Sequence, residues 1–391
     1  LIQIVAGPLP DFEAENATWN RQQANEGGWP WNEDWASLNP AYYDYADRRI
    51  IRLLELGLMP CIVGMWGFYL PFMGVERAKK HWRNLVARYG AYPVVWCLAG
   101  ETTMPTYAHH AIPGAWDSEG AELAKGWSEV ARYLREIDPY HHPLTTHPAW
   151  DRNGRDSVMD ASLLDFDMLQ TAHGGQSIVW PSIEKSIGAI ERTPRMPVVN
   201  GEPCYEGIMG AGWQEVQRAL FWMSVTSGIA GYTYGAHGIW AMSSEKEPFK
   251  GSTLAWGDGN WQETMHYAGS GQVGLGRKLL ERYRWWEFEP RTEEEPIKAG
   301  RVSSFGIGIP GELAIFYLTG RWMEGKFDGV QSTSISIEPG ARYRAYFFDP
   351  RTGTEIPVGP VVPNAEGEWP CPTKPTMNDW ILVMEDERRC R

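Results

Sequence analysis

Short apolar runs alternate with longer segments over the first 290 or so residues of this chain. Seven of these runs, each bounded by residues that break regular structure, cover positions 1–6, 58–63, 93–99, 143–146, 163–169, 197–200 and 231–235. Between them, apolar residues recur every three or four positions, which is the spacing of an amphipathic helix. We expect helices over residues 40–57, 75–89, 119–137, 182–190, 215–227 and 263–283. Strands separated by helices form parallel βαβ units, so the pattern predicts an α/β fold.

The number of strands narrows the choice of α/β fold. Eight βα units close a (β/α)8 TIM barrel, and this sequence supplies seven strands. The chain begins with Leu1 and has no initiating methionine, as if it were entered in the middle of a strand. We therefore expect a (β/α)8 TIM barrel over residues 1–292, with a first strand upstream of residue 1.

The pattern changes near residue 296. Strand-like runs at positions 302–307, 313–318, 334–337, 343–348 and 380–384 are divided by Gly, Pro and Asp turns, with no helical period between them. Such spacing is typical of antiparallel sheets. We predict a small antiparallel β-sandwich domain over residues 296–391, joined to the barrel by the acidic connector 293–296.

Charge and composition limit the class of ligand. The formal net charge is −13, whereas binding to nucleic acid or to an anionic membrane needs clustered Lys and Arg, so we expect neither partner. The cysteines show no ligand spacing and the strand ends carry no His-x-His pair, so we expect no metal and no cofactor. No signal peptide or membrane span is visible, which leaves a secreted, periplasmic or cytoplasmic location open.

Two predicted strands end on the same Gly-Glu pair. Glu101 follows the run 93–99, and Glu202 follows the run 197–200. Side chains at the carboxyl ends of parallel strands face the ligand in barrel enzymes. Two carboxylates in this position are what acid/base and nucleophilic cleavage of a glycosidic bond requires. The structural alternative is that a Gly-Glu after a strand serves only a helix N-terminus or a salt bridge.

The strand numbers suggest a role for each carboxylate. With one strand upstream, Glu101 follows the fourth strand and Glu202 the seventh. This placement resembles the large group of barrel glycosidases in which the fourth-strand Glu is the acid/base and the seventh-strand Glu is the nucleophile. By this analogy, Glu202 attacks the anomeric carbon, while Glu101 protonates the leaving oxygen and later activates water. Glu206, one helical turn after Glu202, is the alternative that mutants must separate.

Aromatic and histidine side chains near the strand ends are the remaining candidates for substrate binding: Trp66, Tyr69, His173, Tyr205, Tyr234, His237 and Trp240. Trp66 and Trp240 could stack on a sugar ring, because a flat aromatic face matches the apolar face of a sugar. His173 could hydrogen-bond a hydroxyl or orient Glu202. Tyr205 or Tyr234 could position the nucleophile through its phenolic group. For each histidine, a satisfied structural role is the alternative.

Several of these motifs together resemble one family. They are Trp66-Gly67 after a strand, Leu98-Ala99-Gly100-Glu101, Asn200-Gly201-Glu202-Pro203-Cys204-Tyr205-Glu206, Gly231-Tyr232-Thr233-Tyr234-Gly235 and Phe348-Asp349-Pro350-Arg351-Thr352-Gly353. Nearly the whole chain is similar to the apiosidase-like glycoside hydrolases, family 140 and its relatives. The resemblance implies a catalytic barrel, a small C-terminal β-domain and exo-cleavage of a terminal sugar from a plant-type glycan. It also implies catalytic roles for Glu101 and Glu202.

The leading hypothesis is therefore a retaining O-glycoside hydrolase that acts in exo mode on a plant-type or microbial glycan. An endo-acting β-glycanase of the same barrel type is the alternative among enzymes, and a long open groove would favour it. A non-catalytic carbohydrate-binding protein is the alternative from another class. That alternative predicts that one of the two carboxylates is absent or points away from the ligand.

Overall fold

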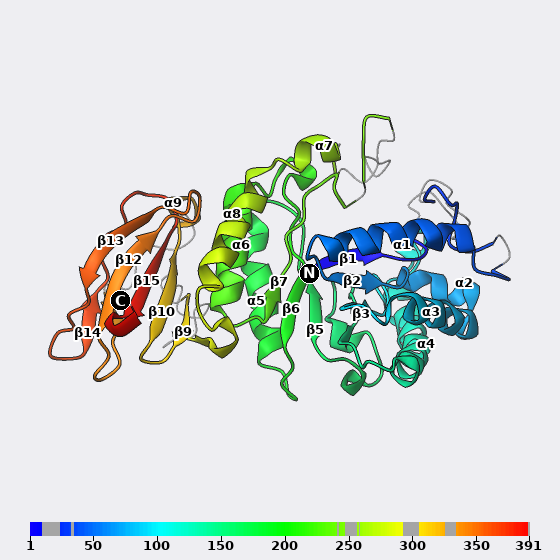
Figure 1. The fold of residues 1–391 in the computed structure, drawn as a ribbon, viewed down its shortest axis with the longest axis horizontal. Coiled ribbons are helices and arrows are strands. Elements are labelled where there is room, and N and C mark those ends of the chain that lie inside the picture. The colour runs from blue at the N-terminus through cyan, green and yellow to red at the C-terminus, as the bar shows by residue number, and fades with distance from the viewer. Residues whose placement is uncertain are drawn as a thin grey trace. The chain divides into compact units, whose positions relative to one another are not determined.

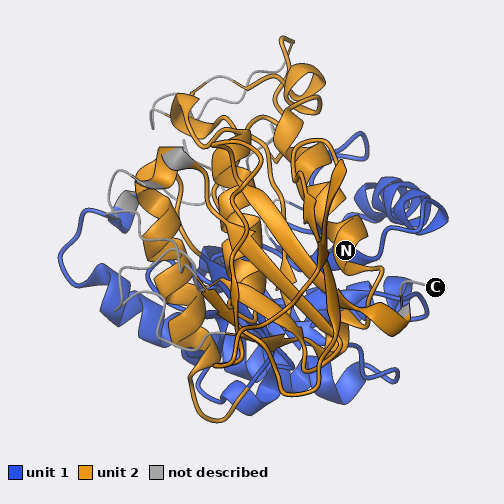
Figure 2. Cartoon of the chain, turned by 90° about the vertical axis from the view of Figure 1, so that its left-hand side faces the viewer, with its two compact units in different colours: residues 1–170, 196–201 blue, residues 171–195, 202–391 orange. Residues whose placement is uncertain are grey.

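The computed structural model describes residues 1–9, 24–32, 35–240, 242–246, 256–257, 259–291, 305–324 and 334–389. The chain divides into two compact units, which Figure 2 colours separately. The first contains Leu1–Gln170 and Met196–Gly201, and the second contains Thr171–Arg195 and Glu202–Arg391. The predicted connector 293–296 and the start of the predicted strand 302–307 lie outside the described residues, so the domain boundaries at 292 and 296 stay predictions.

All seven predicted barrel strands are present. They are β1 (Ile2–Val5), β2 (Pro60–Val63), β3 (Val95–Cys97), β4 (Leu144–Thr145), β5 (Asp167–Gln170), β6 (Val198–Glu202) and β7 (Gly231–Tyr232). The first four form a parallel sheet in sequential order. Figure 1 labels the first three of them. Every residue of β2, β3, β4 and β5 is buried, as expected for a parallel sheet that is covered on both faces.

The helices of the first unit are α1 (Pro40–Glu55), α2 (Leu70–Met73), α3 (Val75–Tyr89) and α4 (Ala115–Ile137). The start of α1 follows from its sequence, because Asn39 accepts a hydrogen bond from the N–H of Ala41 at 3.2 Å and a proline occupies the first helical position. The predicted helices over 40–57, 75–89 and 119–137 are thereby confirmed, and α4 begins four residues earlier than expected.

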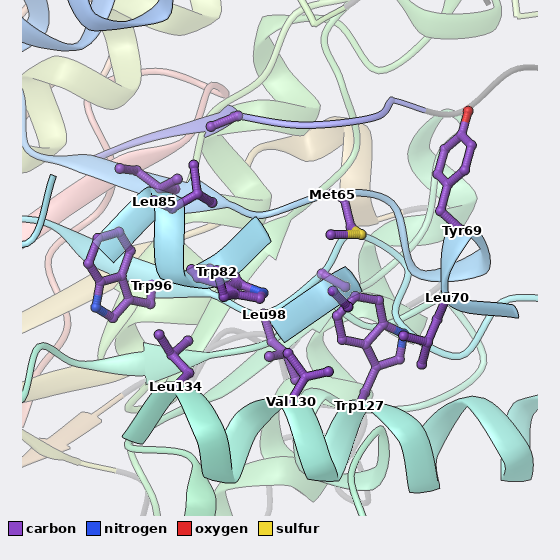
Figure 3. Close-up of a cluster of buried hydrophobic side chains, with 14 of the residues drawn as sticks. Met65, Tyr69, Leu70, Trp82, Leu85, Trp96, Leu98, Trp127, Val130 and Leu134 are labelled. Atoms are coloured by element: carbon purple, nitrogen blue, oxygen red, sulfur yellow. The ribbon is translucent and has the colours of Figure 1, made fainter. Parts of the chain in front are cut away.

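The core of the first unit lies between its sheet and these helices. Trp127, Val130 and Leu134 recur on one face of α4. Figure 3 shows Leu134 pointing toward Trp96 of β3 and Val130 toward Leu98, the residue after β3. All five side chains are buried. The packing of α4 therefore fixes the strand that leads directly into the Gly-Glu pair.

The second unit contains α5 (Val179–Ile190), α6 (Gln214–Thr226), α7 (Trp261–Thr264) and α8 (Ala268–Leu280). The sequence predicted a single helix over residues 263–283. Instead, α7 and α8 are separated at Tyr267, whose backbone is extended with φ −61° and ψ 141°. The Tyr267 ring lies against Gly207, where an added Cβ would be 2.7 Å from Cε2. A tertiary contact of this kind overrides local helix propensity.

A six-stranded antiparallel sheet occupies the C-terminal part of the second unit. Its strands are β8 (Glu289–Pro290), β9 (Gly306–Ile309), β10 (Leu313–Leu318), β12 (Tyr343–Phe348), β13 (Glu355–Pro360) and β15 (Trp380–Asp386), in the order β13-β12-β15-β10-β9-β8. A separate pair joins β11 (Ser334–Ser336) to β14 (Glu368–Pro370), and the short helix α9 (Arg321–Glu324) lies before it in the chain. The predicted antiparallel C-terminal region is confirmed.

Both faces of this sheet are covered. On one face, Ile315 shares a buried cluster with Phe221 of α6 and Leu279 of α8. On the other face, Phe316 shares a cluster with Trp369 of β14. Figure 1 shows α6 and α8 beside β9 and β10. The C-terminal sheet and these two helices therefore bury apolar surface together, which explains why all six residues of β10 are buried.

Candidate active site

Glu101 follows the buried strand β3 and is held by two side chains. The Nε1 of Trp66 donates to Oε2 of Glu101 at 3.1 Å, and the Nε2 of Gln170 donates to Oε1 at 3.2 Å. The backbone of Glu101 has φ +40°, a left-handed conformation that costs a non-glycine residue about 1 to 3 kcal/mol. Strain of this kind persists where the surroundings over-determine a residue, and it is concentrated at functional sites.

Steric crowding explains why the residue before Glu101 is a glycine. Trp66 forms a parallel bridge with Gly100, and a Cβ on Gly100 would lie 2.4 Å from the indole ring. Only glycine lets the indole approach the backbone closely enough to reach the Glu101 carboxyl. His147, after β4, is buried and its ring centre lies 6.4 Å from that of Trp66. Tyr69, a predicted substrate-binding residue, is fully buried and donates its hydroxyl to the carbonyl of Leu9 at 2.8 Å.

Glu202, the last residue of β6, is paired with His173 in the second unit. The Nε2 of His173 lies 2.9 Å from Oε1 of Glu202, and both side chains are largely buried. Burial acts to lower the pKa of His173, but the neighbouring Cys204 and Glu202 side chains outweigh it and raise the pKa to about 9. His173 is therefore a cation at neutral pH, and an adjacent cation favours the ionised form of Glu202.

Aromatic side chains that contact one another extend from His173 as a contiguous group. Tyr205 lies over His173 with ring centres 4.5 Å apart, and Trp240 stacks on Tyr205 at 6.0 Å. The Nε1 of Trp240 donates to Nδ1 of His237 at 3.4 Å, and Nε2 of His237 donates to the carbonyl of Gly257 at 2.7 Å. Because both of its ring nitrogens are engaged, His237 supports Trp240. The structure thus brings four of the predicted residues into one contiguous group, of which His173 contacts Glu202.

Glu206 has different surroundings. The hydroxyl of Tyr234 donates to its Oε2 at 2.6 Å, and the N–H of Gly269, in the first turn of α8, donates to its Oε1 at 3.1 Å. Glu206 is buried, and burial raises its pKa. A carboxyl group at a helix N-terminus stabilises that helix. Glu206 therefore anchors α8, and Tyr234, a predicted substrate-binding residue, bonds to Glu206.

The family model described as apiosidase-like, catalytic domain, matches residues 2–287. The chain belongs to the apiosidase-like family. A solved structure titled glycoside hydrolase is 20% identical with a TM-score of 0.67, and the match covers 99% of this chain and 85% of that one. A family 5 glycoside hydrolase from Bacteroides vulgatus ATCC 8482 is 20% identical with a TM-score of 0.64, over 89% of this chain and 75% of that one. No match was found among curated proteins.

These similarities confirm the predicted fold class and the predicted class of enzyme. The apiosidase-like chain has the α/β barrel-type fold of glycoside hydrolases, followed by an antiparallel C-terminal sheet. Membership of the family makes it a glycoside hydrolase with a carbohydrate substrate.

Within the described residues, no group of three or more His, Cys, Asp or Glu side chains could hold a metal ion. Over those same residues, none of the helices combines the length and the apolar character that a membrane span needs.

Sequence reasoning missed two residues of this apiosidase-like site. Gln170, which donates to Glu101, closes the otherwise apolar strand β5, and a polar residue at that strand end was a usable signal. Cys204, just after β6, is the other: it is buried, and its thiol donates to the carbonyl of Gly174 at 3.1 Å. Nothing in the spacing of the cysteines indicates that contact.

Proposed function

We propose that this apiosidase-like protein is a retaining O-glycoside hydrolase in which Glu202 is the nucleophile and Glu101 is the general acid and base. The observation that carries the proposal is the 2.9 Å pairing of Glu202 with His173, whose pKa is raised to about 9. A carboxyl nucleophile must be ionised when the substrate binds, and a neighbouring cation holds it in that form.

Two observations support Glu101 as the acid and base. Trp66 and Gln170 hold its carboxyl through N–H groups that carry no charge, so each oxygen has a fixed position. A proton donor needs a fixed orientation toward the leaving oxygen. In chain order, Glu101 follows β3 and Glu202 ends β6, so the two carboxylates are three strands apart, as the fourth and seventh strands of barrel glycosidases are.

The proposed reaction has two steps. In the first, Glu202 attacks the anomeric carbon, the bond to the leaving oxygen breaks, and Glu101 gives its proton to that oxygen. In the second, Glu101 takes a proton from water, the water oxygen attacks the anomeric carbon, and Glu202 is released as a carboxylate. Two inversions give a sugar with its original configuration.

Exo action on a plant-type or microbial glycan is the finer part of the proposal, and it rests on the resemblance of the sequence motifs to the apiosidase-like family. An endo-acting β-glycanase is the alternative. The two modes differ in their early products, because exo cleavage releases one terminal sugar while endo cleavage releases a range of chain lengths. Chromatography of the products formed within the first few per cent of conversion distinguishes them.

The test is a screen of aryl glycosides and plant polysaccharide fragments, with the anomer of the first product followed by proton NMR. We expect the wild type to release a sugar of retained configuration, and Glu202→Gln and Glu101→Gln to release far less. Inversion would contradict the double-displacement mechanism. If the wild type cleaves no fragment but binds some of them, the carbohydrate-binding alternative is supported instead.

A further inference from the structure

A continuous series of ring contacts leads away from the Glu101 region within the first unit. Four side chains, Tyr107, His110, Trp116 and Trp150, make up what we call the aromatic strip. Successive ring centres are 4.9 Å, 4.9 Å and 6.2 Å apart. Tyr107 also lies 5.8 Å from Phe68, two residues after Trp66. At the other end, Trp150 is 62% exposed.

Three of the four strip residues lie in the segments that follow β3 and β4, and Glu101 lies at the start of the first of these segments. Tyr107 and His110 lie in the segment after β3, and Trp150 lies in the segment after β4. These two segments are joined next to Glu101, since the N–H and the hydroxyl of Thr102 both donate to the carbonyl of His147, at 3.0 Å and 2.8 Å. The strip is therefore built on the same backbone as the proposed acid/base.

The exposed end of the strip combines an apolar surface with polar neighbours. Trp116 and Trp150 meet edge to face, with ring planes at 65°. Directly after Trp150, Asp151 and Arg152 form an ion pair at 2.8 Å. Arg152 lies against α4, because a Cβ on Gly120 would be 3.3 Å from its Nη1. A pyranose or furanose has the matching surface, with an apolar C–H face that packs on an indole and hydroxyl groups at its rim.

The direction of the strip determines which part of a substrate it meets. A general acid protonates the oxygen of the leaving group, so the leaving-group sugars lie on the side of the acid residue. We propose that Trp116 and Trp150 form a stacking platform for a sugar on the leaving-group side of the cleaved bond. The substrate is then a glycan chain that continues beyond the cleaved bond. This inference rests on the proposed role of Glu101 as the acid.

The experiment compares two substrates that share the terminal sugar found in the screen. One is an oligosaccharide with at least two further sugars on the leaving-group side, and the other is the matching glycosyl fluoride, which places nothing on the platform. We expect Trp150→Ala to lower kcat/KM for the oligosaccharide about tenfold and to leave the fluoride within about twofold, because only the oligosaccharide can stack. Trp150→Phe should recover part of the loss.

Trp286→Ala is the matched control, because Trp286 has nearly the same exposure, 66%, and lies outside the strip. It should change neither rate. An equal loss on both substrates in Trp150→Ala, or no loss on either, would overturn the platform. The catalytic proposal would be unaffected by that result, because it is tested separately by the activity of Glu202→Gln. A wild type that cleaves neither substrate would contradict the proposed function itself, and the inference would go with it.

Discussion

Glu202 and Glu206 are four residues apart, and their neighbours give them different chemistry. Glu202 meets a cationic imidazole at 2.9 Å, whereas Glu206 accepts hydrogen bonds from a phenol and from the first turn of α8. The sequence could not separate them, because both follow the same strand and both are preceded or followed by glycine. Their hydrogen-bond partners come from segments that are distant in the chain, and only the folded structure assigns those.

The two carboxylates should respond differently to the same substitution. Glu202→Gln should reduce kcat by about 10³-fold or more, since the nucleophile is lost, and should also lower the melting temperature, because His173 loses its charge partner. Glu206→Gln should retain catalysis at low temperature but lower the free energy of unfolding by about 1 to 3 kcal/mol, because it disturbs a buried hydrogen-bonded group. Kinetics and denaturant unfolding of both variants test this. If only Glu206→Gln lost activity, Glu206 would be the nucleophile and Glu202 would have the structural role.

His173 makes stability depend on pH in a defined direction. Its pKa in the folded protein is about 9, above the usual value of 6.5, so its protonated form stabilises the fold. That contribution is complete below about pH 6.5 and disappears as the pH rises through about 9, and its size is at most roughly 3 kcal/mol. Unfolding free energies of wild type and His173→Gln, measured across this range, should therefore converge at high pH. A difference that does not change with pH would contradict the ion pair.

Among the helices and strands, the sequence predicted those whose burial leaves an apolar pattern. It missed those that depend on a proline at a sheet edge or on a contact between distant residues. Strands β2 to β5 were recognisable because strands that are buried on both faces are short apolar runs between breakers. β13 was missed because it contains Pro357 and Pro360, which are tolerated at the edge of a sheet and read as turn residues in the sequence. The split between α7 and α8 was missed because the ring of Tyr267 packs on a glycine sixty residues earlier.

In the candidate site, too, strand positions could be predicted from the sequence and contacts between distant residues could not. The positions of Glu101, Glu202 and Trp66 at or just after strand ends could be read from the sequence, whereas their roles stay predictions. The hydrogen bonds from Gln170 to Glu101 and from Cys204 to the carbonyl of Gly174 could not be read from it, because each joins residues from different strands or loops. Residue type at a strand end is visible in a sequence, whereas the partner of that residue is not.

One buried ion pair joins α6 to the C-terminal sheet. Nε and Nη2 of Arg218 contact the two carboxyl oxygens of Asp379, just before β15, at 2.7 Å and 2.8 Å. Nη1 of Arg218 donates to Gln272 of α8 at 2.6 Å. Both members of the pair are almost fully buried. Losing one of them leaves an uncompensated charge inside the protein, which costs more than the pair itself contributes.

We therefore expect Arg218→Met to lower the free energy of unfolding by about 3 to 5 kcal/mol. The double variant Arg218→Met with Asp379→Leu should recover a large part of that loss, because no charge is then buried without a partner. Denaturant unfolding of the two single variants and the double variant measures the coupling. Strictly additive losses would show that the pair is not coupled in the folded protein.

The second unit as a whole depends on a core that its helices and its C-terminal sheet share. Ile315 and Tyr317 of β10 lie in one buried cluster with Leu220 of α6 and Leu279 of α8. A domain that could fold independently would bury its apolar residues within itself. Here the sheet covers an apolar helical surface, so we propose that it stabilises the barrel region.

A chain truncated after residue 288 tests this role. Removing the C-terminal sheet exposes the apolar faces of α6 and α8, and we expect the product to be insoluble or to bind a hydrophobic dye strongly. Val362→Ser is a suitable control, because Val362 is 71% exposed and its replacement should leave solubility unchanged. A soluble, cooperatively folded truncated chain with full activity would show that the sheet is an independent appendage.

The central claim is the division of labour between Glu101 and Glu202, and sodium azide tests it most directly. With an activated glycoside of the sugar that the screen selects, we expect Glu101→Ala plus azide to form a glycosyl azide of retained configuration, because azide replaces water in the second step. Glu202→Ala plus azide should form the inverted glycosyl azide, because azide then replaces the nucleophile. NMR of the two products reads the configuration. The opposite pair of configurations, or two identical ones, would contradict the assignment.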